Sequence, residues 1–434
     1  MRAFAGLPVW SQFLFAVAFA IIVVNLIWTT VLFTCSRRAL HEAPAPQPGG
    51  ADEFLWIFLV PALDEATTIA DSVARLLAVE AKDKVVLVID DGSTDETGAV
   101  LAGIDAPELE VLTRTPPDAR RGKGAALNAA WRRIDRLLAS GRFAGRPRER
   151  VIVGVVDADG RLDPHAPRFA GAHFADDRVG GLQVRVRIYN RSRFLTWCQD
   201  VEFAVYGRLF QAGRTAFGAA GMGGNGQFNR LAALDELAEG SDGPWRDRLT
   251  EDQDLGLRLL EAGWRSVAED RTTVDQQGLP ALRPLLRQRT RWAQGNLQAM
   301  GQLDEMAKLD RPWPVRLDQI GYLLQPVFQA LVGIAFAVSI VFAVFGVASF
   351  WGDDDWWMLA AFFLLGYGGV VLGCVARGAG TGAGGFIRSL LVVPVYAAYS
   401  WLIWPVLARA TARQLTRRST WAKTAREPIG KSTA

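Results

Sequence analysis

The sequence predicts an α/β domain set between apolar, membrane-spanning segments. Strand-like and helix-like stretches alternate from Glu53 to about Asp310, as expected for an α/β domain. Both ends of the chain are apolar, the charges gather in the middle, and 50% of the 434 residues are hydrophobic. The acidic motifs of the middle region follow predicted strands or open predicted helices. In open α/β sheets, ligands bind outside the carboxyl ends of the strands.

The composition excludes several kinds of partner and site. A net charge of +3 does not suggest a nucleic-acid-binding protein. The three cysteines are odd in number and far apart, so no disulfide framework is predicted. The three histidines lack zinc-type spacing. A bound metal would therefore sit among carboxylates, which favours Mg²⁺ or Mn²⁺.

Residues 1–40 are predicted to hold a transmembrane helix. The stretch 11–33 is apolar and exceeds the ~20 residues that cross a bilayer as a helix. A secretory signal is the alternative, but no A-x-A cleavage site follows. Arg37 and Arg38 come directly after the span, so the positive-inside rule predicts a cytoplasmic location for the next region. Prolines and glycines mark 41–52 as a linker.

The central stretch of the predicted domain is Val151–Gly160. Its β-branched apolar run indicates a strand buried on both faces of a parallel sheet. The run ends in Asp157 and Asp159, followed by glycine. Two carboxylates at a strand end can share a hard divalent cation, which can in turn hold a diphosphate. The alternative is that both side chains only make turn hydrogen bonds.

A second pair of carboxylates follows an earlier strand. Phe54–Val60 and Val85–Ile89 are the first two predicted strands, and the second ends at Asp90 and Asp91. Adjacent carboxylates at a strand end suit hydrogen bonding to a base or a ribose. Ordinary turn chemistry is again the alternative.

Two helix starts follow. Ser93 and Glu96 have capping-box spacing, which predicts a helix beginning at Ser93. Gly122–Asn128 opens another helix, and its Lys123 could reach a phosphate or could simply be solvated.

A glycine-rich stretch, Gly218–Asn229, comes after a further predicted strand at Val179–Ile188. Its glycines permit close approach of the backbone to a ligand. The alternative is a flexible loop.

The next helix start carries a candidate base. Thr250 and Gln253 have capping-box spacing, so Asp252 is expected in the first turn, where the helix dipole favours its ionised form. An ionised carboxylate at a site can accept a proton. Acids at helix starts more commonly only satisfy the dipole.

Gln288–Trp292 combines an amide, two arginines and an indole. On a helix, Gln288 and Trp292 are four residues apart and share one face, with Arg291 beside them. Arginine can clamp phosphate oxygens, and an indole can stack on the apolar face of a sugar. A surface arginine–tryptophan pair is the alternative.

The carboxy-terminal region is predicted to return to the membrane. Val315–Gln325 could lie at the interface as an amphipathic helix, and Pro326–Phe350 and Trp356–Ala376 are predicted spans. Between them, Asp353–Asp355 is expected to form a turn on the outer side. Phe386–Leu407 is apolar but contains two prolines, so it could bend back or lie shallow.

A basic tail occupies 409–434. Strict alternation of spans places it outside, whereas its positive charge favours the cytoplasm, the side that we expect.

The order of the motifs resembles family 2 glycosyltransferases, in the membrane-embedded branch that includes cellulose, chitin and hyaluronan synthases. The resemblance covers about Val60 to Trp292 and rests on Asp90-Asp91-Gly92-Ser93, Asp157-Ala158-Asp159, Thr250-Glu251-Asp252 and Gln288-x-x-Arg291-Trp292. It implies a GT-A fold, a Rossmann-like mixed sheet, in residues 53–310. It also implies a nucleotide-sugar donor, Mg²⁺ or Mn²⁺, and inversion at the anomeric carbon.

The resemblance also implies roles for individual residues. Asp252 would be the general base and Asp159 the metal ligand. The donor would be held by Pro61, Glu65, Asp90, Asp91, Lys123, Asp157 and Arg291. The acceptor would be bordered by Gly224, Asn225, Gly226, Glu251, Gln288 and Trp292. The motif Leu63-Asp64-Glu65 and the loop Gly224-Asn225-Gly226-Gln227 depart from the usual family patterns, so neither identifies the donor or acceptor.

The expected function is therefore transfer of a sugar, with UDP as the expected carrier, to a growing β-linked polysaccharide by a multi-pass membrane enzyme with its catalytic domain in the cytoplasm. Partner subunits for export would be possible. Two alternatives remain: a single-transfer glycolipid synthase with a lipid acceptor, and a non-enzymatic nucleotide-sugar-binding subunit. Residues 311–408 would hold the interfacial helix and two or three membrane segments.

Overall fold

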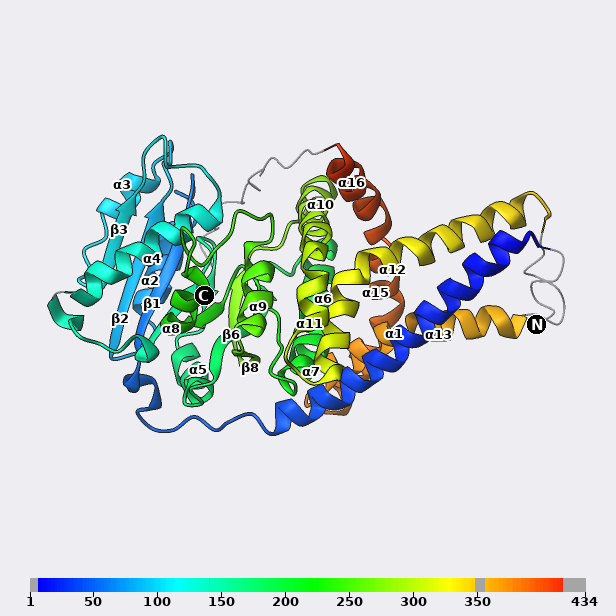
Figure 1. Ribbon diagram of the computed structural model, residues 1–434, viewed down its shortest axis with the longest axis horizontal. Coiled ribbons are helices and arrows are strands. Elements are labelled where there is room, and N and C mark those ends of the chain that lie inside the picture. Colours follow the sequence, from blue (N-terminus) through cyan, green and yellow to red (C-terminus); the bar gives the residue numbers. More distant parts are fainter. Residues whose placement is uncertain (1–6, 140, 348–355, 417–434) are drawn as a thin grey trace.

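The computed structural model describes residues 7–139, 141–347 and 356–416, without the side chains of 356–363. An α/β domain lies at one end of the molecule and long helices extend from the other (Figure 1). Among the described residues, three helical stretches are long and apolar enough to cross a membrane: Val9–His41, Trp313–Val344 and Gly382–Leu415.

The domain is built on one eight-stranded sheet in the order β3-β2-β1-β4-β7-β6-β8-β5. The strands are β1 (Leu55–Ala62), β2 (Asp83–Asp90), β3 (Leu109–Thr113), β4 (Val151–Val155), β5 (Arg161–Leu162), β6 (Val179–Ile188), β7 (Gln227–Arg230) and β8 (Arg265–Gln276). Strands β1 to β4 run parallel, β7 is antiparallel to both of its neighbours, and β5 is antiparallel to β8. The sheet is therefore mixed, as the predicted fold class requires.

Strand β4 lies in the middle of this sheet, and all five of its residues are buried. It pairs in parallel with β1, where Leu55 lies opposite Val151, but antiparallel with β7, where Ile152 lies opposite Arg230. The expected parallel surroundings are therefore correct on one side only. A continuous apolar run reports burial on both faces but not the direction of the neighbouring strands.

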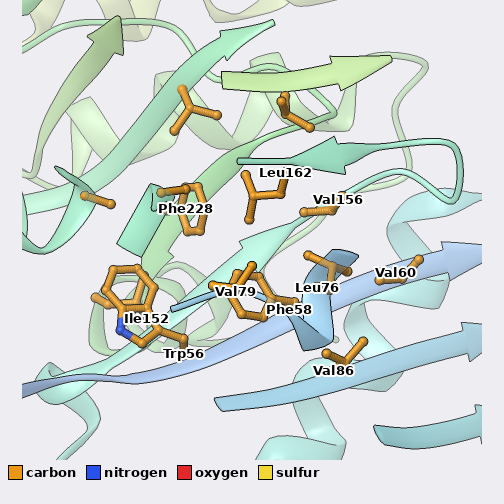
Figure 2. Close-up of a cluster of buried hydrophobic side chains, with 14 of the residues drawn as sticks. Trp56, Phe58, Val60, Leu76, Val79, Val86, Ile152, Val156, Leu162 and Phe228 are labelled. Carbon is orange, nitrogen blue, oxygen red and sulfur yellow. The ribbon is translucent and has the colours of Figure 1, made fainter. Parts of the chain in front are cut away.

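The two faces of the sheet carry separate cores. Strand β1 sends Trp56, Phe58 and Val60 into one core, and its alternate residues into the other (Figure 2). Phe228 of β7 stacks edge-on against both Trp56 and Phe58. A Cβ atom on Gly154 of β4 would lie 2.8 Å from the Phe228 ring, so this glycine makes room for that ring. Each fully buried large side chain stabilises the sheet by about 1.5–3 kcal/mol.

Helices cover the sheet and connect it to the membrane region. Those of the domain are α2 (Ile69–Leu77), α3 (Thr97–Ala102), α4 (Lys123–Ala139), α5 (Ala166–Phe174), α6 (Phe194–Val205), the π-helix η5 (Tyr206–Gln211), α7 (Ala212–Thr215), α8 (Leu231–Ala238), α9 (Glu251–Glu261), α10 (Leu282–Ala299) and α11 (Leu303–Lys308). The remaining helices are α1 (Val9–His41), α12 (Trp313–Val344), α13 (Trp356–Gly378), α14 (Gly382–Leu391), α15 (Val393–Ser400) and α16 (Ile403–Leu415).

One local prediction within the domain is wrong, and one alternative is only partly correct. Helix α3 begins at Thr97 rather than at Ser93, because the Ser93 amide donates to Asp90 Oδ1 and its hydroxyl accepts from the Asp64 amide. Ser93 is therefore part of a turn. The glycine-rich stretch also does not stay a loop to its end, because Gln227–Arg230 pairs with β4 and β6 as strand β7.

The membrane-side helices are longer than predicted. Helix α1 continues through Arg37 and Arg38 to His41, so these arginines lie in its last turns rather than after it. The expected interfacial helix and the span after it form one continuous helix, α12, with Pro326 inside. Packing of neighbouring helices lets membrane helices tolerate an internal proline.

Helices α1, α12 and α13 lie side by side, with the start of α1 at the end of this bundle that points away from the sheet (Figure 1). The stretch Gly382–Leu415 does not extend this bundle. It is broken at Val392 and at Trp401, and α15 and α16 run steeply across the bundle at its domain end (Figure 1). Helix α16 packs on α10, where Val406 and Ala410 contact Ala293. The predicted acidic turn at 353–355 and most of the basic tail lie outside the described residues.

Candidate active site

A cavity of about 890 Å³ opens where the carboxyl ends of β1, β2 and β4 meet α6, α10 and α12. It brings together thirteen of the fifteen predicted site residues: Pro61, Glu65, Asp91, Lys123, Asp157, Asp159, Gly224, Asn225, Glu251, Asp252, Gln288, Arg291 and Trp292. The other two, Asp90 and Gly226, are not among its lining residues.

Asp90 and Gly226 support the cavity from behind. Asp90 is 6% exposed, and its Oδ1 accepts the Ser93 amide at 2.9 Å, which builds the turn after β2. Gly226 has φ +75°, and a Cβ atom there would lie 2.5 Å from Val274. Its amide donates to the Val155 carbonyl. Both residues therefore shape the backbone around the cavity.

The two carboxylates after β4 are positioned by segments far away in the sequence. The Asp157 amide donates to Asn225 Oδ1 at 3.1 Å, which ties the strand end to the glycine-rich loop. The Gln277 amide, just after β8, donates to Asp159 Oδ2 at 3.2 Å. Asp159 is only 4% exposed. Both carboxylates are thus fixed at the cavity wall before any ligand binds.

Lys123, the first residue of α4, lies between the two groups of carboxylates. Its Nζ is 2.6 Å from Asp157 Oδ1 and 4.0 Å from Glu251 Oε1, and it donates to the Gly224 carbonyl at 2.6 Å. Burial lowers the pKa of the Lys123 ammonium, but the negative charges of Asp157, Glu251 and Asp252 outweigh this effect and leave the pKa raised. Lys123 therefore stays charged at the centre of the site.

Asp91 lines the cavity beside an arginine that the sequence motifs did not indicate. Arg114, just after β3, forms an ion pair with Asp91 in which both side chains are 9% exposed. Burial raises the pKa of Asp91, whereas the charge of Arg114 opposes the rise.

The start of α9 carries two acids, the buried Glu251 and the half-buried Asp252. Burial, followed by the charge of Asp252, raises the pKa of Glu251 to about 7 against the opposing charges of Lys123 and Arg291. Burial also raises the pKa of Asp252, although Lys123 and the Gln253 amide lower it. The helix dipole was expected to dominate at Asp252. Removal of water has the larger effect, which makes Asp252 a stronger proton acceptor when it is ionised.

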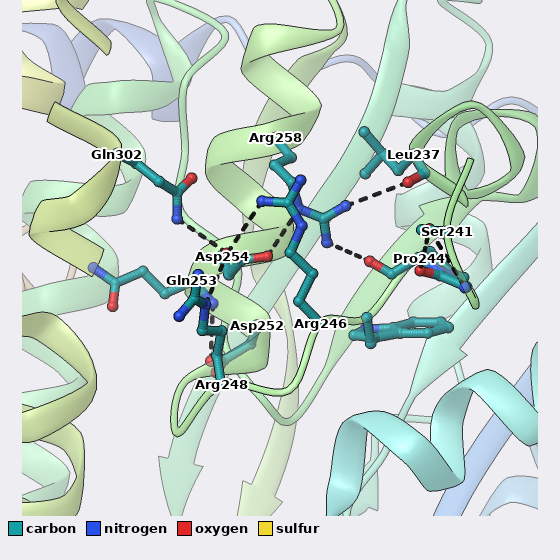
Figure 3. Close-up of polar contacts among 12 residues, drawn as sticks. Leu237, Ser241, Pro244, Arg246, Arg248, Asp252, Gln253, Asp254, Arg258 and Gln302 are labelled. Atoms are coloured by element: carbon teal, nitrogen blue, oxygen red, sulfur yellow. Dashed lines mark hydrogen bonds and ion pairs between the residues drawn. The ribbon is translucent and has the colours of Figure 1, made fainter. Parts of the chain in front are cut away.

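A buried polar network behind Asp252 holds this helix start in place (Figure 3). Asp254 Oδ2 pairs with Arg258 Nε at 2.8 Å, and both side chains are almost fully buried. Gln302 donates to Asp254 Oδ1 at 3.0 Å, and Arg258 also donates to the Pro244 and Leu237 carbonyls. Removing one partner of a buried ion pair typically costs about 3–5 kcal/mol. The four-residue spacing of Asp254 and Arg258 was the sequence signal for this network.

One face of α10 forms another wall of the cavity. Gln288, Arg291 and Trp292 all line it, as the helical spacing predicted. The Trp292 ring meets Phe203 edge-on at 6.3 Å, and the Arg289 guanidinium lies 4.2 Å from the Trp292 ring centre. Arg289 in turn pairs with Glu202 at 2.7 Å. Trp292 is thus held between α6 and an arginine that sequence reasoning missed.

The cavity wall also includes five aromatic residues that were not predicted. Phe203, Tyr206 and Phe210 come from α6 and η5, Tyr322 from α12 and Tyr396 from α15. No local motif marks these residues, because they meet only through tertiary packing of the membrane-side helices against the domain.

The carboxylates fit a metal ion that is shared with a ligand. No group of three or more His, Cys, Asp or Glu side chains suited to a metal occurs in the described parts of the chain. Asp157 and Asp159 supply hard oxygen ligands at the cavity wall. Mg²⁺ is usually held by one or two carboxylates together with substrate phosphates and water. The residues present therefore suit Mg²⁺ or Mn²⁺ bound jointly with a diphosphate.

Comparisons with known proteins agree with this site. The family model described as "Glycosyltransferase like family 2" matches residues 56–295. The chain is 31% identical over 297 residues to a beta-monoglucosyldiacylglycerol synthase of Synechocystis sp., covering 65% of this chain and 57% of the relative. It is 26% identical over 296 residues to a poly-beta-1,6-N-acetyl-D-glucosamine synthase of Staphylococcus aureus, covering 67% of this chain and 66% of the relative.

The chain thus spans less than two thirds of the length of either relative. Among solved structures, it is similar to a mannosyltransferase of Pyrobaculum calidifontis in complex with GDP-Man and Mn²⁺, with a TM-score of 0.61 and 19% identity. That match covers 93% of this chain and 99% of the other, and it supports the fold. Because the family model covers more than half of the sequence, the chain belongs to the family 2 glycosyltransferases and has their GT-A fold.

Proposed function

We propose that this chain is a membrane-bound, inverting glycosyltransferase that moves a sugar from a nucleoside-diphosphate donor to an acceptor hydroxyl, with Asp252 as the base. One observation carries the proposal. A Cβ atom on Gly224 would lie 3.2 Å from both Asp252 Oδ2 and Lys123 Nζ, and Lys123 Nζ is 2.6 Å from Asp157. The candidate base thus lies beside the candidate diphosphate site, as a direct displacement requires.

The chain's own residues account for the steps of such a transfer. Asp252 would take the proton from the acceptor hydroxyl as the hydroxyl attacks the anomeric carbon, and the nucleoside diphosphate would leave from the opposite face. Lys123 and Arg291 would stabilise the leaving diphosphate with their positive charges. Asp159, with Asp157, would hold Mg²⁺ or Mn²⁺, which supplies further charge neutralisation when bound. A single displacement inverts the anomeric configuration.

The donor would bind along the sheet. Pro61, Glu65 and Asp91 line the cavity on the β1–β2 side of Asp157. We assign them to the nucleotide, with Asp90 acting through the turn that it builds. UDP is the expected carrier.

A growing β-linked polysaccharide is the first candidate acceptor. Trp292 offers an indole face for stacking on a sugar, and it lines the cavity together with Gln288 and the Gly224–Asn225 backbone. Glu251 lies beside them and would border the same acceptor. The relative named poly-beta-1,6-N-acetyl-D-glucosamine synthase supports this candidate, and export subunits would be expected partners.

A lipid is the second candidate acceptor, favoured by a different observation. Tyr322 of α12 and Tyr396 of α15 line the cavity, so helices on the membrane side form part of its wall. The relative named beta-monoglucosyldiacylglycerol synthase supports this candidate.

We also propose that α1, α12 and α13 cross the membrane, while Gly382–Leu415 lies along its cytoplasmic surface. The three short helices of this stretch have 10, 8 and 13 residues, and each is too short to cross alone. They lie at the domain end of the bundle, as does the end of α1 (Figure 1), whose last turns hold Arg37 and Arg38. The catalytic domain, residues 53–310, and the end of α16 would then share the cytoplasmic side.

A cysteine at Thr416, in a variant without the native cysteines, tests this topology. It should resist impermeant thiol reagents in intact cells and react after lysis. Labelling in intact cells would instead show that Gly382–Leu415 crosses the membrane.

The function itself is tested by incubating the full chain in membranes with a panel of nucleoside-diphosphate sugars and measuring released diphosphate and product size. Long products support the polysaccharide, and a single added sugar on a lipid supports the glycolipid. Binding of a donor without any turnover would leave a nucleotide-sugar-binding subunit as the better interpretation.

A further inference from the structure

A second buried polar group lies outside the donor site, where the domain meets the membrane-side helices. Arg214 of α7 pairs with Asp318 of α12, with 2.7 Å between Nε and Oδ2. The two side chains are 8% and 1% exposed. Trp28 of α1 donates its indole N–H to the other oxygen of Asp318 at 2.8 Å. One buried carboxylate therefore joins three helices, which we call the Asp318 junction (Trp28, Arg214 and Asp318).

The packing around the junction leaves little room for movement. The Trp28 ring stacks on Phe217, with an interplanar angle of 15°. A Cβ atom on Gly213 of α7 would lie 2.5 Å from the Leu32 carbonyl oxygen of α1. Helices α1 and α7 thus touch backbone to backbone, and the start of α12 is fixed to α7 by a charge pair and to α1 by a hydrogen bond.

The junction extends to a tyrosine of the cavity. The Arg214 guanidinium lies 4.6 Å from the centre of the Tyr322 ring, and Tyr322 is one helical turn beyond Asp318 on α12. Tyr322 lines the cavity, and so does Tyr206 of η5. The same arginine therefore holds the Tyr322 ring at the cavity wall.

Tyr206 lies on the side of the cavity that carries the proposed base. Asp252, Tyr206 and Tyr322 all line this cavity. A Cβ atom on Gly221 would lie 3.7 Å from the Tyr206 hydroxyl, which places this hydroxyl beside the loop that leads to Gly224. Gln211 fixes that loop through two hydrogen bonds of 2.8 Å to the Gly221 backbone. A π-helical turn such as η5 is frequent at functional sites.

We propose that Tyr206 and Tyr322 bind the acceptor and turn its reacting hydroxyl toward Asp252, and that the Asp318 junction positions Tyr322. A phenol can both donate and accept a hydrogen bond, so the pair can hold a hydroxyl group while Asp252 takes its proton. Helix α12, a membrane-side helix, then contributes directly to the acceptor site. The inference rests on the proposed glycosyl transfer. Asp318 and Arg214 are positioning residues, because they act through Tyr322.

The test compares two reactions of the full chain in membranes: transfer to the acceptor, and slow hydrolysis of the donor by water when no acceptor is added. Tyr322→Phe and Tyr206→Phe keep the rings and remove the hydroxyls. We expect the acceptor KM to rise about tenfold in each, the usual effect of losing one hydrogen bond. The donor KM and the rate of donor hydrolysis should not change.

Tyr367→Phe is the matched control. Tyr367 is a tyrosine of α13 that does not line the cavity and whose hydroxyl accepts a hydrogen bond from Trp401. It should leave both reactions unchanged. The double variant Tyr206→Phe and Tyr322→Phe should lose less than the product of the single effects, since both hydroxyls would hold the same acceptor group.

Asp318→Asn tests the positioning role. The amide keeps the shape and a partner for Trp28 but removes the charge that holds Arg214. We expect a rise in acceptor KM with unchanged donor hydrolysis, whereas a general loss of folding would lower both. An unchanged acceptor KM in Tyr322→Phe, or an equal fall of transfer and hydrolysis, would overturn the inference. Absence of all turnover in the unmodified chain would instead remove the proposed function on which it rests.

Discussion

The two ends of the cavity are built in different ways. At the proposed donor end, Asp91, Asp157 and Asp159 come shortly after a strand, and Lys123 is the first residue of a helix. At the proposed acceptor end, the wall comes from α6, η5, α10, α12 and α15, which are joined by tertiary contacts. Site residues that follow strand ends can be recognised in short sequence motifs. Site residues that are brought together by the packing of distant helices cannot.

The two ends also differ in how charge is balanced. Lys123 lies among three carboxylates at the boundary between the ends, so the donor side is strongly polar. On the proposed acceptor side, charged side chains form the ion pairs Arg289–Glu202 and Arg214–Asp318. Aromatic rings on this side line the cavity. A charged diphosphate and a carbohydrate or lipid acceptor would suit these respective ends. The variants below separate the two ends.

The largest effect is expected at the donor end, from Asp159→Ala. Loss of a metal ligand should lower transfer by roughly 10³-fold or more, because metal charge neutralisation is worth several kcal/mol in the transition state. EDTA should abolish the activity of the unmodified chain, and Mg²⁺ or Mn²⁺ should restore it. Binding of Mn²⁺ with the nucleoside diphosphate, followed by electron paramagnetic resonance, should weaken in the variant. Exposed Asp105→Ala is the control, and activity that persists in EDTA would contradict the prediction.

Asp252→Asn should have the next largest effect. The amide preserves the helix start but cannot take a proton, so transfer should fall about 10²–10⁴-fold. Donor affinity, measured by calorimetry, should stay within about twofold, because Asp252 is assigned to the other end of the cavity. The control is Asp247→Asn, on the exposed loop before α9. Near-normal transfer in Asp252→Asn would exclude this residue as the base.

The same contrast explains how much was predictable from the sequence. The strand and helix that carry Asp157 and Lys123 were expected from apolar runs and glycine signals, and the structure has them as β4 and α4. The Gln288–Trp292 spacing also placed its side chains on one helix face. By contrast, no spacing rule relates Tyr206 to Tyr322, because both reach the cavity only through the tertiary fold.

Two further failures have a physical cause. Ser93 and Glu96 have the spacing of a capping box, but a serine hydroxyl can serve a turn equally well, and here it accepts the Asp64 amide. At Asp252, burial raises the pKa and outweighs the helix dipole, and burial depends on the whole fold. The local sequence shows which hydrogen-bonding and charged side chains are present. Which of their possible interactions is strongest depends on the tertiary structure.

Lys123→Met should give an intermediate effect with a distinct pH signature. Burial raises the pKa of Asp252 and the charge of Lys123 lowers it, so removing the charge should raise that pKa further. Asp252 can act as a base only when ionised, so activity is present above its pKa and is lost as the pH falls through it. The acid limb of the pH–rate profile should therefore move to higher pH.

At pH 7 we expect about a tenfold loss of transfer in Lys123→Met, since a close opposite charge commonly changes carboxyl ionisation by at least that factor. Exposed Lys82→Met, outside the cavity, should leave the profile in place. A uniform loss at every pH, with no movement of the acid limb, would assign Lys123 to the diphosphate alone.

The smallest effect is expected where the two ends meet, from Gly224→Ala. The added Cβ would lie 3.2 Å from Asp252 Oδ2 and from Lys123 Nζ, so both side chains must shift by a few tenths of an ångström. Such a shift should lower kcat by roughly two- to tenfold, since a misplacement of about 1 Å can cost about 100-fold. Gly301→Ala, where a Cβ would meet nothing within 4 Å, is the control. Because the methyl group touches the base and the lysine together, transfer and donor hydrolysis should fall in parallel, unlike in Tyr322→Phe. A change in acceptor KM alone would place Gly224 wholly at the acceptor end.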